Sequence, residues 1–129
     1  MREYKPPLDS KKIEMSEILK NLGLTRTVSM TLACLSDGQE LSSKEIETIS
    51  GLRQPEVSSA TKYLIEKGWI EIREEKITTN KGRPTKLYTL VAPIDKITKD
   101  IEADILSQNR NILDNIEYLK DFVDNPQKI

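Results

Sequence analysis

Residues 39–72, QELSSKEIETISGLRQPEVSSATKYLIEKGWIEI, decide the fold. Ser42 or Ser43 can cap a short helix, and the next glycine along the chain ends it. After a break of three residues, Pro55 lies where the first turn of a helix tolerates a missing N–H. This second helix runs to about Lys67, before another glycine. The stretch therefore predicts two helices joined by a tight turn.

The two predicted helices have distinct inner and outer faces. The inner residues follow helical spacing: Ile46 and Ile49 in the first helix, and Val57, Ala60, Thr61 and Leu64 in the second. The outer face of the second helix carries polar residues, mostly small: Gln54, Glu56, Ser58, Ser59 and Lys62. Such residues can reach base edges without holding a helix out of the DNA major groove, as in a helix-turn-helix. The alternative is that these serines are simply solvated.

A basic hairpin is predicted directly after the second helix. Two runs rich in strand-forming residues can pair antiparallel, at positions 69–73 and 87–91. From Lys76 through Lys86 there are four basic residues and no acidic one, a local charge of +4, with no acid near enough to pair the cations. Gly82 lets the backbone pass close to a phosphate, and Pro84 stiffens the tip. This pattern predicts a wing that contacts DNA.

Two further helices are predicted before this stretch. Asp9 or Ser10 can cap the first, which begins near Lys11. Thr25 caps the second, residues 26–36, whose apolar content indicates a buried core helix. The apolar positions of the first helix fall mainly on one face: Ile13, Met15, Ile18, Leu19 and Leu22.

After Pro93 the pattern predicts one long helix, from about Ile94 to Val123. Apolar residues recur at steps of three and four, with Gln108 and Asn115 in the gaps. A helix of about 30 residues is roughly 45 Å long, too long to bury fully against a small domain. We therefore predict a dimerisation helix, against the alternative of a solitary helix folded back on its own domain. Its contact residues would be Ile94, Ile101, Ile105, Ile112, Ile116, Leu119 and Phe122.

Composition restricts the possible chemistry. The chain has no histidine and one cysteine, Cys34, within an apolar run. This excludes the usual Cys/His zinc sites and Ser-His or Cys-His nucleophile pairs, so we predict no enzyme, metal site or cofactor. With 20 basic and 21 acidic residues, the net charge is −1, and any attraction to DNA must be local. No apolar run approaches the ~20 residues needed to span a bilayer, and the polar start predicts a cytoplasmic protein.

The run from Leu41 to Leu90 resembles the winged helix-turn-helix of archaeal and bacterial regulators of the MarR/TrmB-like group. The matching pieces are QPEVSS, EKGWI and GRPTKLYTL, and the resemblance covers about residues 12–91. It implies DNA contacts by the recognition helix, the wing and the start of the preceding helix. Arg53, directly before the recognition helix, is added to these contacts. The predicted DNA-binding residues are Ser43, Lys44, Arg53, Gln54, Pro55, Glu56, Ser58, Ser59, Lys62, Lys81, Gly82, Arg83 and Lys86.

Glu56 places an acid on the predicted reading face. Its carboxylate could accept a hydrogen bond from a cytosine amino group. It could instead favour the positive end of the helix and contact nothing. The sequence leaves both interpretations open.

The predicted fold is therefore mostly α with a small β-hairpin wing. It comprises a flexible lead-in (1–10), a winged helix-turn-helix domain (11–92) and a C-terminal dimerisation helix (93–129). The predicted function is sequence-specific binding of double-stranded DNA by a homodimeric transcription regulator. The alternative is a winged-helix interaction module in a larger protein assembly. No residue pattern specifies the operator, the sign of regulation or a small-molecule effector.

Overall fold

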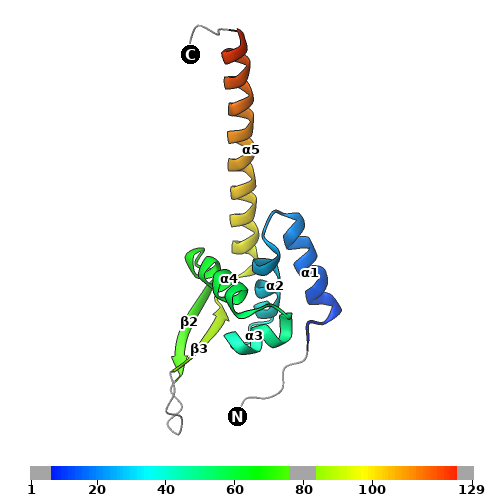
Figure 1. Cartoon of the computed structure of the whole chain (residues 1–129), viewed down its shortest axis with the longest axis vertical. Coiled ribbons are helices and arrows are strands. Elements are labelled where there is room, and N and C mark those ends of the chain that lie inside the picture. The colour runs from blue at the N-terminus through cyan, green and yellow to red at the C-terminus, as the bar shows by residue number, and fades with distance from the viewer. Residues whose placement is uncertain (1–6, 76–83, 125–129) are drawn as a thin grey trace. The chain divides into compact units, whose positions relative to one another are not determined.

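The computed structural model describes residues 7–75 and 84–124. Within them the chain forms five helices and three strands (Figure 1). In chain order they are α1 (Ser10–Asn21), α2 (Arg26–Leu35), β1 (Leu41–Ser42), α3 (Ser43–Ser50), α4 (Gln54–Glu66), β2 (Ile70–Glu75), β3 (Thr85–Leu90) and α5 (Ile94–Asp124). The predicted mostly helical class with a small β-hairpin is confirmed. The chain divides into two compact units, Met1–Ala92 and Pro93–Ile129.

Side-chain caps fix where the first three helices begin. Each cap accepts the backbone N–H three residues further on: Asp9 at 2.8 Å, Thr25 at 3.2 Å and Ser42 at 3.1 Å. At α3 the bonding is reciprocal, because a carboxylate oxygen of Glu45 accepts from the backbone N–H of Ser42 at 2.8 Å. The cap of α1 is therefore Asp9 and not Ser10, and the cap of α3 is Ser42 and not Ser43.

Helix α2 forms the centre of the first unit. It packs against α1, α3 and α4, and Figure 1 shows it between α1 and α4. Its last four residues, from Leu32 to Leu35, are fully buried. The predicted inner residues of α3 and α4 are all buried against this core: Ile46, Ile49, Val57, Ala60, Thr61 and Leu64. The helical spacing read from the sequence thus corresponds to the core.

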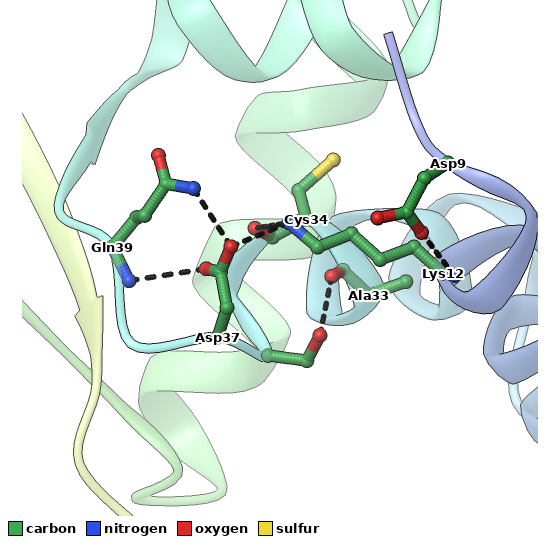
Figure 2. Close-up of polar contacts among 7 residues, drawn as sticks. Asp9, Lys12, Ala33, Cys34, Asp37 and Gln39 are labelled. Carbon is green, nitrogen blue, oxygen red and sulfur yellow. Dashed lines mark hydrogen bonds and ion pairs between the residues drawn. The ribbon is translucent and has the colours of Figure 1, made fainter. Parts of the chain in front are cut away.

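The buried face of helix α1 differs from the face that its apolar residues predicted. Of the predicted apolar positions only Leu19 is buried, whereas Ile13, Ile18 and Leu22 are 49%, 52% and 40% exposed. A polar contact links α1 to the end of α2. Figure 2 shows Lys12 reaching across to that end, where its Nζ lies 2.8 Å from an Asp37 carboxylate oxygen.

The Lys12 ammonium reinforces the end of α2 in two ways. It also donates to the carbonyl oxygen of Cys34 at 3.5 Å (Figure 2). A cation is favourable at this carbonyl end of a helix because the helix dipole is negative there. Asp37 in turn accepts from the backbone and side-chain N–H groups of Gln39, at 3.2 and 2.7 Å. The polar cluster therefore closes the turn after α2.

The sheet has the order β1–β3–β2, with both pairs antiparallel. Tyr88 of β3 lies opposite Leu41 on one side and Ile72 on the other. β1 was not predicted, since two residues are too few to show alternation. Trp69 was predicted to open the first strand, but it lies just before β2. Its buried ring packs edge-on against Tyr63, with ring centroids 6.4 Å apart.

Helix α5 forms the second unit and has 31 residues. Its exposed large hydrophobic residues are Ile94, Leu106, Ile112, Leu113, Ile116, Tyr118, Leu119, Phe122 and Val123. Ile105 is half-buried. Ile101, another predicted dimer contact, is 6% exposed in the single chain. None of the helices that the structure describes is long and apolar enough to cross a membrane.

Candidate nucleic-acid interface

The outer face of α4 is a continuous polar ridge. Gln54, Ser58 and Lys62 follow one another at every fourth residue, and all three are exposed. Pro55 and Ser59 lie beside them and are also exposed. The ridge is about 12 Å long at 1.5 Å per residue, comparable with the ~12 Å width of the DNA major groove. It bears groups that can donate or accept hydrogen bonds and one cation.

The N-terminus of α4 is organised by Glu56. One carboxylate oxygen accepts from the backbone N–H of Arg53 at 2.9 Å. The other accepts from Arg26 Nη1 of α2 at 3.2 Å. The Arg53 backbone bond, and to a lesser degree Arg26, hold the pKa of Glu56 below its ordinary value. The carboxylate is thus engaged within the chain, at the positive helix end where one of the two sequence interpretations placed it, but with two partners.

Arg26 is a neighbour of this helix start that sequence reasoning missed. It is the first residue of α2 and lies 30 residues before Glu56 in the chain. Its side chain is 56% exposed. No local pattern reports so distant a pairing, and the Thr25 cap shows only that Arg26 begins a helix.

A surface hollow of about 500 Å³ lies between the start of α3 and the base of the wing. Its described lining comprises Ser42, Ser43, Lys44, Glu74, Pro84, Thr85 and Lys86. Three predicted DNA-binding residues, Ser43, Lys44 and Lys86, thus meet here from separate segments. The N-terminus of α3 contributes further partial positive charge. The hollow has the size and donor groups to receive an anionic group, although Glu74 opposes this.

The prediction that no acid lies near the cations of the wing is wrong at its base. In the register of β2 and β3, Glu74 is directly opposite Lys86, because the hairpin folds the chain back on itself. Opposite charges in this position attract each other across the strands. The predicted tip residues Lys81, Gly82 and Arg83 lie outside the described residues.

Arg73 of β2 is held by acids at the base of the wing. Its guanidinium donates to both carboxylate oxygens of Glu40, at 2.6 and 2.7 Å, and to Glu75 at 3.2 Å. The side-chain bond to Glu40 is the main reason that the pKa of Arg73 is raised. Because Glu40 directly precedes β1 and Arg73 belongs to β2, the bond links both sides of the sheet. Arg73 is therefore a structural cation.

The described residues offer donors, acceptors and charges for recognition. Among residues 7–75 and 84–124, no group of three or more His, Cys, Asp or Glu side chains could hold a metal ion. Cys34 is fully buried, and burial raises the pKa of its thiol to about 12. It therefore fits the core role that its apolar neighbours indicated.

Comparison by sequence finds one family model that matches the central part of the chain. The model of the MarR family matches residues 22–76, which extend from the end of α1 to the end of β2. No curated protein matches the chain.

Comparison by structure extends this likeness. TrmBL2, described as an archaeal chromatin protein with a novel mode of DNA binding, is 18% identical with a TM-score of 0.62. The match covers 87% of this chain but only 41% of that one, so this chain spans less than half of TrmBL2. A possible transcriptional regulator from Methanosarcina mazei is 15% identical, with a TM-score of 0.60 and coverage of 82% and 87%. A further transcriptional regulator is 19% identical, with a TM-score of 0.55 and coverage of 91% and 77%. At these identities the likeness establishes the fold.

Proposed function

We propose that the chain, whose winged helix-turn-helix fold is similar to that of MarR-family and other transcription regulators, binds double-stranded DNA to regulate transcription. The observation that carries the proposal is the exposed polar ridge of α4, next to the motif's other helix, α3, whose start borders the hollow with Lys44 and Lys86. A recognition helix and a nearby phosphate-binding surface are the two parts that such recognition needs.

The two parts have different chemical tasks. In the major groove, Gln54, Ser58 and Ser59 read base edges with short neutral groups that distinguish donors from acceptors. Ser43, Lys44 and Lys86 bind phosphates, together with Lys62 at the far end of the α4 ridge. The wing tip, with Lys81 and Arg83, reaches the backbone or a narrow minor groove. Phosphate contacts fix the register of the protein, and base contacts provide the sequence preference.

The proposed regulator acts as a homodimer joined through α5. Between Leu106 and Val123 this helix exposes eight large hydrophobic residues. Monomeric proteins rarely leave so many large apolar side chains of one helix in water. A two-fold dimer presents two α4 helices to DNA, so its half-sites lie about 34 Å apart or a multiple of that distance.

Selection of bound fragments from a random DNA pool tests this function. The expected result is enrichment of a two-fold-symmetric sequence with half-sites one or two helical turns apart. Enrichment of an asymmetric single site would retain DNA binding but contradict the symmetric dimer. If no fragment is enriched and unrelated DNA is not bound, the winged helix serves as an interaction module instead.

The division between reading and positioning is tested by two substitutions. Gln54→Ala is expected to cost about 1–3 kcal/mol on the selected site and to leave binding to unrelated DNA nearly unchanged. Arg83→Ala is expected to weaken both complexes similarly and to flatten their salt dependence. A salt titration of both variants on both DNAs makes the comparison, and a reversed pattern would contradict the assignment.

A further inference from the structure

An acid on the DNA-facing side of α4 creates an electrostatic problem for the proposed complex. Glu56 lies in the first turn of this helix and is 35% exposed. Its pKa is lowered, so the carboxylate keeps its charge at neutral pH. Phosphates approaching the helix start would be repelled by this charge unless a cation stands nearby.

Arg26 supplies such a cation from outside the helix-turn-helix. Its Nη1 lies 3.2 Å from a Glu56 carboxylate oxygen. The guanidinium has five N–H donors, and with 56% of the side chain exposed it still presents donors to solvent. An ion pair this exposed contributes little to stability, so holding α2 to α4 is a weak explanation for it.

The surroundings favour a phosphate as the other partner of Arg26. Arg53, also exposed, directly precedes α4, so the helix start carries two cations against one acid. Backbone N–H groups at the first turn of α4 add partial positive charge. Arginine suits this position because its planar fork can bind a carboxylate on one side and a phosphate on another.

We infer that Arg26 of α2 is an additional DNA-backbone contact, which Glu56 holds beside the recognition helix and which in turn cancels the repulsion between Glu56 and DNA. Glu56 acts here as a positioning residue. This inference rests on the proposed DNA-binding function, and it extends the interface from α3, α4 and the wing to the start of α2.

The test compares Arg26→Gln with Glu56→Gln, the double variant and Arg26→Lys. Glutamine at position 56 can still accept the Arg53 backbone N–H, so the helix start is preserved. Lys20→Gln is the matched control, because Lys20 is likewise a cation paired with a glutamate, at the end of α1. Affinity for a duplex of unrelated sequence is measured across a salt series for the full-length protein and each variant.

Arg26→Gln is expected to weaken binding roughly tenfold and to reduce the slope of log affinity against log salt by about 0.9, the value for one phosphate contact. Arg26→Lys should keep the wild-type slope, and Lys20→Gln should leave both quantities unchanged. The double variant should bind more tightly than Arg26→Gln alone, because the uncompensated carboxylate is gone.

Several results would overturn the inference. An unchanged salt slope in Arg26→Gln would show that Arg26 contacts no phosphate, even if affinity fell through loss of folded protein. A double variant as weak as Arg26→Gln would contradict the role of Glu56. Failure of the wild-type protein to bind any DNA is a different outcome, since it would reject the proposed function itself.

Discussion

Replacing Ile112 by Asp tests whether the exposed apolar surface of α5 holds the proposed dimer. Ile112 is 56% exposed in the single chain. Complete burial of an isoleucine is worth about 1.5–3 kcal/mol, so the exposed part represents roughly 0.8–1.7 kcal/mol for each subunit. Two-fold symmetry doubles this to about 1.7–3.4 kcal/mol, which corresponds to a roughly 15- to 300-fold weaker dimer.

The aspartate adds a second cost, because an unpaired charge would enter an apolar contact. This costs several kcal/mol beyond the lost burial, so the dissociation constant of the dimer should rise at least about a hundredfold. Sedimentation velocity over a range of protein concentrations measures it. We expect monomers of Ile112→Asp at concentrations where the wild-type protein is dimeric.

The control is Ala103→Asp, which adds the same charge at an exposed position on the opposite side of α5. Consecutive residues of a helix point about 100° apart, so the nine positions between Ala103 and Ile112 place these side chains about half a turn apart. This variant should sediment like the wild-type protein. A dimeric Ile112→Asp variant would show that the contact surface has been misassigned, and dissociation of both variants would indicate a general effect of charge on α5.

Three further substitutions address the wing, the polar cluster and the core. Glu74→Gln removes the acid opposite Lys86 and should tighten binding to unrelated DNA several-fold in fluorescence anisotropy at low salt; weaker binding would place the hollow outside the interface. Asp37→Asn should lower the free energy of unfolding in urea by up to about 1 kcal/mol at pH 7, a value reduced for its 38% exposure. Burial raises the pKa of Asp37, but hydrogen bonds from Lys12 and Gln39 outweigh this effect and lower the folded pKa. The difference in unfolding free energy between the wild type and Asp37→Asn should therefore persist above the ordinary pKa of about 3.9. It should shrink as pH falls through the lower folded pKa. A difference that grew on acidification would contradict the assignment. Leu64→Ala empties a fully buried site of α4 and should cost about 2–5 kcal/mol in the same assay, whereas a cost near zero would mean that α4 is not anchored there.

The sequence predicted best what depends on neighbouring residues. Helix α4 is the clearest case, because Val57, Ala60 and Leu64 recur at helical spacing and Gly68 follows the last turn. Such spacing is a local property, and it identifies both the buried face and the face left exposed. The predicted ridge of Gln54 and its neighbours was therefore found without knowledge of the tertiary structure.

Features that depend on distant pairing were not predictable in this way. The contact between Arg26 and Glu56 joins residues 30 apart, and that between Glu40 and Arg73 joins residues 33 apart. The register that sets Glu74 against Lys86 depends on how the hairpin turns. Charge counting along the chain treats these acids and bases as independent. Only the folded arrangement shows which cations are already neutralised.

Because Cys34 is buried, the reactivity of its thiol reports how often the core opens. The chain has one cysteine, its side chain is fully enclosed, and its thiol pKa is about 12. Since the thiolate is the reactive species, thiol reagents can label this sulfur only when α2 separates from its neighbours. The labelling rate therefore measures how often the centre of the domain opens, without any engineered probe. DNA or a partner that binds the folded form would reveal itself by slowing that reaction.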